Sequence, residues 1–306
     1  MSVMEDRFYE GLVNIVGEEA LLRDEPLSRH TSFRIGGPAD YFTEPHNSDE
    51  IKDIIELCKK AGVPFAIMGN GSNLLVSDEG YRGVIICISK SMRAIKTEGE
   101  HIYAEAGALL AGIAREAQSN SLTGFEFAGG IPGTLGGAVV MNAGAYGGEM
   151  VQVIESADVL DTEGNLLTLK NEELELGYRT SVIPKKNYIV VSAMIKLNKT
   201  DDTEGIRSKM QELLSRRKEK QPLEYPSAGS TFKRPEGYFA GKLIEDAGLK
   251  GFSIGGAYVS EKHSGFVINK GGATAKDVLE LIEYVKNTVF EKFGVELEPE
   301  VKMLGF

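Results

Sequence analysis

The stretch from Phe127 to Gly148, which reads FAGGIPGTLGGAVVMNAGAYGG, constrains the fold more than any other part of this 306-residue chain. Eight of its residues are glycine: Gly129, Gly130, Gly133, Gly136, Gly137, Gly144, Gly147 and Gly148. Inside a regular element each glycine costs roughly 0.5–1 kcal/mol relative to alanine. The run is therefore expected only where the backbone turns tightly or approaches another group closely.

A second glycine-rich segment follows residues 63–69, an apolar run that is expected to be a buried strand. It reads GNGSNLLVSD over residues 69–78. Gly69 and Gly71 permit close approach of a ligand to the backbone. Asn70, Ser72 and Asn73 add side-chain donors beside the backbone N–H groups, and such a turn forms an anion-binding nest.

Two familiar phosphate-binding motifs do not match these segments. A P-loop requires Gly-Lys followed by Ser or Thr, and the chain has no such triplet. The dinucleotide motif G-x-G-x-x-G requires a third glycine where this chain has Leu74. One flat apolar ring system joined to one pyrophosphate would suit both glycine segments together. The alternative is that both are turn-rich loops without a ligand.

The rest of the chain predicts mixed helix and strand structure in three successive units. Asn47 and Glu50 form a capping-box pattern before a helix that ends at Gly62. Residues 153–170 predict a hairpin that turns at 163–165. The other expected strands are residues 40–45, 63–69, 83–89, 102–107, 188–197, 264–270 and a last strand within 295–306, and the other expected helices are 108–118, 203–220, 239–247 and 274–294.

Composition excludes several classes of protein. The net charge is −11 and the isoelectric point is near 5.1, which argues against a nucleic-acid or anionic-membrane partner. The N-terminal residues do not resemble a signal peptide, and no run is apolar enough to span a bilayer, so we expect a cytoplasmic protein. Cys58 and Cys87 are expected to be reduced and buried. The four histidines lack metal-ligand spacing, so no metal site is predicted.

Six motifs in order carry a resemblance to a known family. They are RHTSFRIGGPAD (29–40), GNGSNLLVSD (69–78), FAGGIPGTLGGAVVMNAGAYG (127–147), YRTS (178–181), SAGSTFKRP (227–235) and LEPEVKMLG (297–305). Together they resemble the UDP-N-acetylenolpyruvoylglucosamine reductase family over nearly the whole chain after about residue 25. The short connection after GYRTS resembles the shorter, type II form, which lacks a loop that carries a substrate-contacting tyrosine.

The resemblance implies an α+β and α/β fold with three domains. The first two form an FAD-binding fold of the vanillyl-alcohol-oxidase type, over residues 1–94 and 95–202. The third, over residues 203–298, binds a UDP-sugar as a C-terminal α+β domain. The last strand, at about 299–306, is expected to return to the first domain.

The resemblance also implies that the two glycine segments hold FAD non-covalently. The implied contacts from the first segment are Gly69, Asn70, Gly71, Ser72, Asn73 and Leu74. Those from the second are Gly129, Gly130, Ile131, Pro132, Gly133, Gly136, Gly137, Ala138, Asn142 and Gly144.

The reaction implied is NADPH-dependent reduction of an enolpyruvyl ether to a lactyl ether, a step of peptidoglycan precursor synthesis. Hydride reaches C3 of the substrate and a proton reaches C2. Ser230 is the implied proton donor, Arg179 faces the substrate carboxylate, and Glu300 lies beside the enolic oxygens. Without the resemblance, Ser230 could be a turn serine, Arg179 a surface ion-pair residue, and Glu296 or Glu298 the relevant acid.

Three further residues are expected to contact substrate. Tyr178 would lie against it, and Lys220 would pair with the diphosphate. Arg234 stands where some relatives have asparagine, and it would contact the uracil or a phosphate. Lys220 could otherwise belong to the solvated end of a basic helix, where the helix dipole favours positive charge.

Two other functions remain open from the sequence. The first is another FAD-dependent oxidoreductase of the same fold, such as an oxidase of small alcohols, which would use only the glycine segments. The second is a non-catalytic protein that binds a sugar nucleotide without flavin. In either case the expected partners are small molecules, UDP-sugar and NADPH for the reductase, and the protein is expected to be a monomer.

Overall fold

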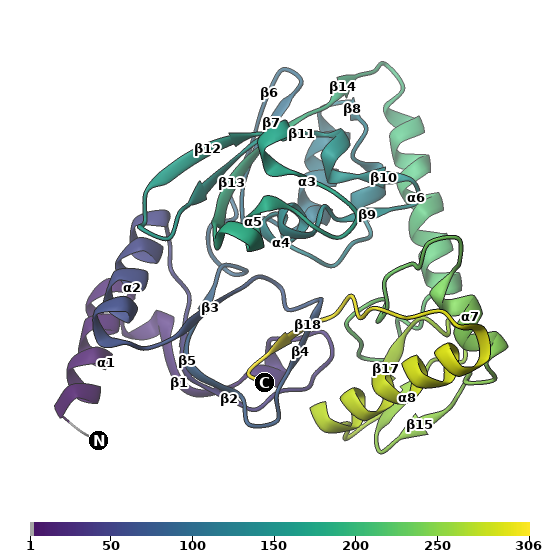
Figure 1. The fold of residues 1–306 in the computed structure, drawn as a ribbon. Coiled ribbons are helices and arrows are strands. Elements are labelled where there is room, and N and C mark those ends of the chain that lie inside the picture. Colours follow the sequence, from purple (N-terminus) through teal and green to yellow (C-terminus); the bar gives the residue numbers. More distant parts are fainter. Residues whose placement is uncertain (1–2) are drawn as a thin grey trace. The chain divides into compact units, whose positions relative to one another are not determined.

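The computed structural model describes residues 3–306, with side chains from Asp6 onward (Figure 1). It separates into two compact units, each with its own apolar core. Unit 1 consists of the chain up to Arg23 together with Tyr41–Asn70 and Gly83–Arg216. Unit 2 consists of Asp24–Asp40, Gly71–Arg82 and Arg217–Phe306. The first glycine segment therefore begins in unit 1 and continues in unit 2.

A five-stranded antiparallel sheet forms the centre of unit 1, in the order β12-β11-β13-β7-β6. Its strands are β6 (Ile95–Glu98), β7 (His101–Glu105), β11 (Ile154–Leu160), β12 (Leu166–Lys170) and β13 (Ile189–Lys196). The central strand β13 is buried along nearly its whole length, which explains its apolar sequence IVVSAMIK. Helices α3 (Leu110–Ser119) and α4 (Leu135–Met141) pack against this sheet (Figure 1).

Helix α2 (Ser48–Ala61) follows the capping signals in the sequence. The Asn47 side chain accepts a hydrogen bond from Glu50 N at 2.9 Å, and Gly62 ends the helix in the left-handed conformation. Its buried residues are spaced to form one face: Ile51, Ile54, Ile55 and Cys58. Helix α2 also packs against α1 (Val3–Val16), for which the sequence analysis made no prediction.

Another sheet has the strand order β1-β2-β5-β3. Its strands are β1 (Leu21–Pro26), β2 (Pro38–Thr43), β3 (Phe65–Met68) and β5 (Tyr81–Cys87). Strand β3 pairs with β5 in parallel, from Phe65 opposite Val84 to Met68 opposite Cys87. Because β3 ends at Met68, the glycine segment begins directly at the carboxyl end of a parallel strand.

Unit 2 is built around helix α8 (Ala275–Phe293), which packs against α7 (Ala240–Asp246) and a three-stranded sheet. The sheet consists of β15 (Ser253–Ile254), β16 (Ala257–Val259) and β17 (Val267–Asn269). Separately, the final strand β18 (Lys302–Leu304) pairs in parallel with β4 (Leu74–Val76). The C-terminal strand thus lies beside the continuation of the first glycine segment.

The remaining elements are short, apart from α6 (Thr203–Lys220), whose bounds match the sequence prediction. The short strands are β8 (Leu122–Thr123), β9 (Gly144–Ala145), β10 (Gly148–Glu149) and β14 (Asn198–Lys199), and the short α-helix is α5 (Val182–Lys186). The 3-10 helices are Glu18–Ala20, Leu27–Arg29, Glu126–Ala128, Met150–Gln152 and Asn171–Leu174.

The glycine run itself contains α4, which the sequence analysis did not predict. Leu135, Ala138 and Val139 are buried on one face of this helix, at helical spacing. Burial of that face stabilises a helix in spite of Gly136 and Gly137, because tertiary packing outweighs their low helix propensity. The three-domain division remains a prediction, since the two compact units follow different boundaries.

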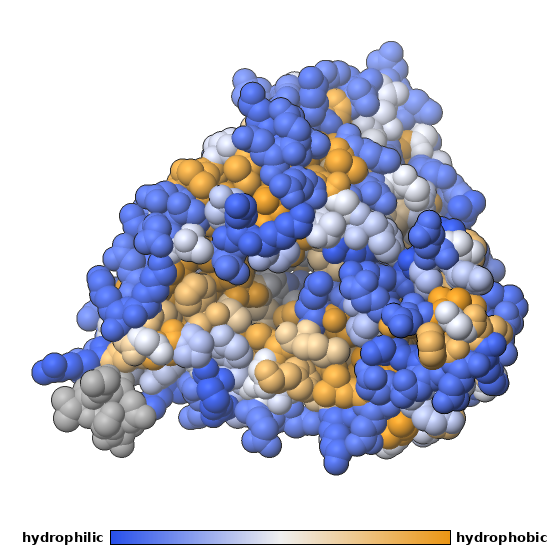
Figure 2. All heavy atoms as spheres, viewed as in Figure 1, coloured by the Kyte–Doolittle hydropathy of each residue, from blue (hydrophilic) through white to orange (hydrophobic). Residues whose placement is uncertain are grey.

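Both cysteines are unpaired and buried, as expected. Burial raises the pKa of Cys58 to about 12 and also raises that of Cys87. None of the helices in residues 3–306 is long and apolar enough to cross a membrane. Hydrophilic side chains dominate the visible face in Figure 2, with apolar ones in smaller groups.

The Asp78 carboxylate binds the N-terminal end of α8 and so connects this helix with the segment Gly71–Arg82 of unit 2. Its carboxylate accepts hydrogen bonds from Ala275 N at 2.8 Å and from Lys276 N at 3.1 Å. Asp78→Ala is expected to lower the free energy of unfolding by about 1 kcal/mol, the usual effect of losing a helix cap. Urea unfolding followed by circular dichroism measures this, with Glu79→Ala as the control. An equal loss in both variants would contradict the capping role.

Candidate active site

The two glycine segments meet within unit 1. The Asn70 side chain donates a hydrogen bond to Pro132 O at 2.7 Å. Next to this contact, a Cβ atom on Gly69 would lie 2.5 Å from Thr134 Oγ1. Thr134 is buried and pairs with Leu109 through an isolated β-bridge, so its side chain has little freedom to move. A Cβ at position 69 would therefore require the Thr134 side chain to move.

The protein's own packing leaves little or no space for a side chain at several glycines of the second segment. A Cβ on Gly148 would lie 2.4 Å from the Phe127 ring, and one on Gly136 would lie 3.1 Å from Ala106 Cβ. The long glycine run thus arises partly because α4 and the following hairpin pack tightly against unit 1 itself. A Cβ on Gly144 would likewise lie 2.6 Å from Gly148 O, and ligand approach stays the predicted reason only for glycines without such a close neighbour.

Arg179 lies at the tip of a tight turn in unit 1. Gly177 and Thr180 pair through two backbone hydrogen bonds, 3.1 and 3.2 Å long. Arg179 adopts φ +56°, a left-handed conformation that is uncommon for a residue other than glycine. Its guanidinium donates to Gly144 O at 3.3 Å and lies 5.2 Å from the centre of the half-exposed Tyr178 ring. Local backbone strain of this kind is concentrated at functional sites.

Ser230 and Glu300 lie on two paired segments of unit 2. Glu300 N donates to Thr231 O at 2.8 Å, and Phe232 forms a bridge with Pro299. One residue before Thr231 in the chain is Ser230. The antiparallel pairing therefore brings the backbone of Ser230 close to that of Glu300, although 70 positions separate them in the sequence.

The same pairing separates Glu300 from the other nearby acids. Lys233 N donates to Glu298 O, and the Lys233 ammonium forms an ion pair with the Glu298 carboxylate. The negative charge of Glu298 is thus balanced by the Lys233 ammonium, and the Glu298 side chain is largely exposed. Glu296 is also exposed, whereas Glu300 is partly buried. These differences favour Glu300 among the three candidates.

Asn73 connects the first glycine segment to Glu300. Its side-chain nitrogen donates to Glu300 O at 3.2 Å, and its backbone oxygen accepts from Lys302 N at 2.9 Å. Ser32 makes a related connection, because its hydroxyl donates to Ser227 O at 2.7 Å and lies 3.5 Å from Gly71 O. Hydrogen bonds therefore connect four of the six motifs, residues 29–40, 69–78, 227–235 and 297–305, inside unit 2.

The other predicted substrate residues lie on the surface of unit 2. Lys220 is the exposed last residue of α6. The Arg234 guanidinium lies 4.0 Å from the centre of the exposed Phe239 ring, and its Nε donates to Tyr238 O at 3.3 Å. The guanidinium of Arg234 thus contacts an aromatic ring, an arrangement that sequence spacing alone did not predict.

Residues that were not predicted from the sequence bind the Ser230 segment through Thr231. Thr231 N donates to Gly265 O, and Val267 N donates to the Thr231 hydroxyl at 2.9 Å. Gly265 N in turn donates to Nδ1 of His263 at 3.1 Å. Burial lowers the pKa of His263, so its neutral form is favoured, with the proton on Nε2. The SAGSTF motif pointed to this region, but not to these partners.

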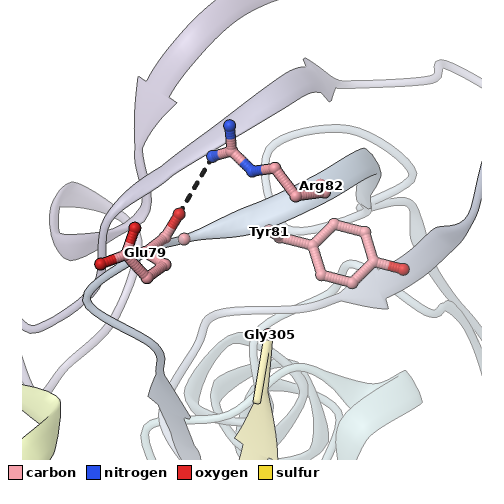
Figure 3. A pocket seen from close by; sticks show the side chains of 5 residues that line it. Glu79, Tyr81, Arg82 and Gly305 are labelled. Atoms are coloured by element: carbon pink, nitrogen blue, oxygen red, sulfur yellow. Dashed lines mark hydrogen bonds between the residues drawn. The ribbon is translucent and has the colours of Figure 1, made fainter.

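A shallow hollow of about 440 Å³ in unit 2 lies away from these residues. Glu79, Gly80, Tyr81, Arg82 and Gly305 line it (Figure 3). The Arg82 side chain donates to Glu79 O at 3.0 Å and forms an ion pair with Asp40 at 2.9 Å. None of the predicted site residues lines this hollow, so it is not the candidate active site.

Comparison with known proteins defines first the class and then the family. Residues 39–170 match the FAD binding domain, and residues 221–304 match the C-terminal domain of UDP-N-acetylenolpyruvoylglucosamine reductase. The fold is that of a flavoprotein oxidoreductase, as the sequence predicted.

Relatives that match nearly the whole chain identify the family within this class. The reductase of Caldanaerobacter subterraneus is 57% identical over 99% of both chains, and that of Clostridium perfringens is 56% identical over 97% of both. The crystal structure of the reductase from Thermus caldophilus has a TM-score of 0.79 and 36% identity, over 93% of this chain and 98% of its own. The chain belongs to the UDP-N-acetylenolpyruvoylglucosamine reductase family.

The residues at the two glycine segments fit an FAD molecule. Gly69 follows a buried parallel strand, and Gly71 adopts φ +60°, so the backbone bends as an anion-binding turn requires. Asn70 fixes this turn to the second segment through Pro132. The individual FAD contacts remain predictions, and the Asn70 and Asn142 amides both also bind the protein itself.

Gly69→Ala tests the close approach at this turn. The added methyl would overlap Thr134 Oγ1, so the free energy of unfolding should fall by about 1–3 kcal/mol. The double variant Gly69→Ala/Thr134→Ala removes the overlapping oxygen and should recover most of that loss relative to Thr134→Ala alone. Urea unfolding of the four proteins measures this coupling. Additive losses would contradict a direct contact between positions 69 and 134.

Proposed function

We propose that Arg179, Ser230 and Glu300 carry out the reaction of this enzyme. The protein is an FAD-dependent oxidoreductase that reduces UDP-N-acetylglucosamine enolpyruvate to UDP-N-acetylmuramate, in peptidoglycan precursor synthesis, with NADPH as reductant. The observation that carries the residue assignment is the pairing of Thr231 with Glu300, which joins the SAGSTF and EPEVKM motifs. When bound, FAD accepts hydride from NADPH and supplies hydride to C3 of the substrate.

Ser230 donates the proton that C2 of the substrate requires. A serine hydroxyl is a weak acid, but a substrate that has gained hydride at C3 carries a strongly basic carbon at C2. Proton transfer to that carbon is favourable without any lowering of the serine pKa. The paired backbone of Thr231, bound to both Gly265 and Glu300, holds the adjacent Ser230 in place.

Arg179 binds the substrate carboxylate. A guanidinium stays charged at all physiological pH values and can bind a carboxylate through two parallel hydrogen bonds. Negative charge that builds up on the enolpyruvyl group during hydride transfer is delocalised onto this carboxylate. The fixed positive charge of Arg179 would therefore bind the transition state more strongly than the ground state.

Glu300 acts beside the enolic oxygens of the substrate. Its backbone is fixed on both sides, because its N–H binds Thr231 and its carbonyl binds Asn73. Glu298 forms an ion pair with Lys233, so it is the weaker candidate for this role. Asn73 thus links the predicted FAD turn to the acid on the substrate side.

The remaining contacts concern the nucleotide part of the substrate. Lys220 pairs with the diphosphate, Arg234 with the uracil or a phosphate, and Tyr178 lies against the substrate. Lys220 and Arg234 are both exposed residues, which supports contact of these two cations with a nucleotide. We further propose that the enzyme acts as a monomer in the cytoplasm.

The function is tested by the absorbance of the purified protein. We expect a yellow protein from which acid precipitation releases FAD, because attachment is non-covalent. NADPH should bleach the flavin band, and the UDP-enolpyruvyl sugar should restore it. Bleaching of the flavin by a small alcohol in place of NADPH, with no effect of the UDP-enolpyruvyl sugar, would favour a different flavoenzyme. A colourless protein that binds the sugar nucleotide would overturn the proposal.

Ser230→Ala separates the two halves of the reaction. The fold should survive, since one turn hydroxyl contributes about 1 kcal/mol. Bleaching by NADPH should remain near the wild-type rate, because it requires no proton from Ser230. Reoxidation by the UDP-enolpyruvyl sugar should slow by about 10²–10⁴-fold, the usual scale of general acid catalysis. Stopped-flow absorbance at the flavin band measures both rates.

The matched control is Ser227→Ala, which removes a hydroxyl from the same motif three residues earlier. The known contact of Ser227 uses its backbone oxygen, which the substitution leaves in place. Wild-type reoxidation by the Ser230→Ala variant would show that Ser230 is not the proton donor. An equal slowing in both variants would indicate a structural disturbance of the motif.

A further inference from the structure

Asn142 lies at the end of α4, in the middle of the long glycine run. Asn142 is only 1% exposed, and it adopts φ +44° as the C-terminal cap of the helix. Asparagine tolerates this left-handed conformation better than most residues. The side chain of Asn142 is therefore fixed inside unit 1 by both its burial and its backbone.

Every polar atom of the Asn142 side chain is bound by the protein. Its nitrogen donates to Glu149 Oε2 at 3.0 Å and to Gly177 O at 3.1 Å. Its oxygen accepts from Val151 N at 2.8 Å. One amide thus connects the hairpin segment 144–151 with the turn that contains Arg179.

The turn is held to α4 at two points on either side of Arg179. Gly177 O accepts from Asn142 before the tip, and the Ser181 hydroxyl donates to Val140 O at 2.7 Å after it. Arg179 itself occupies the left-handed region at φ +56°. Because this conformation is unfavourable for arginine, the turn depends on its tethers to keep the guanidinium in position.

Asn142 also supports the residues around Gly144, whose carbonyl accepts the hydrogen bond from the Arg179 guanidinium. Arg179 donates to Gly144 O, and a Cβ on Gly144 would lie 2.7 Å from Glu149 Cγ. The Glu149 side chain, which Asn142 binds, therefore lies directly against Gly144. Asn142 fixes both the turn that carries Arg179 and the residues that support its anchor.

We infer that Asn142 is a positioning residue that orients Arg179 toward the carboxylate of the substrate. The inference rests on the proposed role of Arg179. It gives Asn142 a different function from the FAD contact that the sequence resemblance implied. The specific consequence is that Asn142 governs recognition of the carboxylate, and not of the UDP-sugar as a whole.

Asn142→Asp is the most selective substitution. The aspartate oxygen still accepts from Val151 N, and its size is unchanged. The second oxygen, however, replaces a donor and would face both the Glu149 carboxylate and Gly177 O. The resulting repulsion should displace the turn that holds Arg179, with little change in core volume.

Two ligands separate carboxylate recognition from binding in general. UDP-N-acetylglucosamine enolpyruvate carries the carboxylate, and UDP-N-acetylglucosamine lacks it. Titration calorimetry with the oxidised, FAD-loaded enzyme, without NADPH, measures both affinities. In Asn142→Asp we expect the Kd for the enolpyruvyl sugar to rise by about tenfold or more, the scale of losing a hydrogen bond to a charged group. The Kd for UDP-N-acetylglucosamine should stay within about twofold of wild type.

Asn171→Asp is the matched control. The Asn171 side chain also lies in unit 1 and also donates to two backbone carbonyls, of Val151 at 2.9 Å and of Ile154 at 2.6 Å. The same chemical change at position 171 should reduce stability but leave the ratio of the two affinities unchanged. If Asn142→Asp does not fold, Asn142→Gly keeps the left-handed backbone and provides the same comparison.

Two further variants test whether the effect passes through the proposed contacts. Glu149→Gln should partly rescue Asn142→Asp, because glutamine can donate to the new carboxylate. Arg179→Lys should lose discrimination between the two ligands on its own. Adding Asn142→Asp to Arg179→Lys should then cause little further loss, since the two residues act in one chain of contacts.

Three outcomes would overturn the inference. The first is an unchanged ratio of the two affinities in Asn142→Asp, while Arg179→Lys loses discrimination between the ligands. That result would overturn the role of Asn142 and leave the role of Arg179 intact. The second is loss of flavin from Asn142→Asp with discrimination unaffected, as expected for an FAD contact. The third is equal binding of both ligands by wild type, which would also remove the proposed role of Arg179.

Discussion

The candidate site of unit 2 depends on the backbone pairing around Glu300. Glu300 N binds Thr231 O, Lys302 N binds Asn73 O, and Phe232 bridges to Pro299. Glu298 and Glu300 are two residues apart, so the alternation of side chains along a strand puts both on the same face and does not distinguish them. The observed register leaves Glu298 exposed, in an ion pair with Lys233, and places Glu300 with Asn73 and Thr231. The ion pair and exposure of Glu298, and the partial burial of Glu300, therefore favour Glu300 as the predicted acid.

In unit 1 the equivalent constraint is the close packing of α4 and its flanking loops. The Asn70 side chain binds Pro132 O, and Gly148 packs against the Phe127 ring. Thr134 lies so close to Gly69 that no space remains there for a Cβ. The C-terminal end of α4 then supplies Asn142 and Val140, which bind the turn on both sides of Arg179. The same helix thus supports a predicted FAD-binding segment and a predicted substrate-binding turn.

Local signals predicted the longer elements well. The caps at Asn47 and Gly62 delimit α2, and the predicted helices 203–220 and 274–294 lie close to the observed bounds of α6 and α8. Helix α4 was missed, because two glycines give it low propensity and only burial of Leu135, Ala138 and Val139 stabilises it. The short strands β4 and β18 were hard to predict separately, because each is stabilised by pairing with the other across more than 200 residues.

The sequence by itself determined the family, the class of cofactor and the residue types available for the chemistry. Glycine clusters, a turn serine and a motif glutamate are local features, and their order along the chain is sufficient to recognise them. Only the tertiary structure decided which groups support them: Asn73 and Thr231 beside Glu300, Asn142 beneath the Arg179 turn, and Phe239 against Arg234. The physical reason is that most of these partners come from segments far apart in the chain. Their contacts follow from strand register and helix packing, which no local spacing encodes.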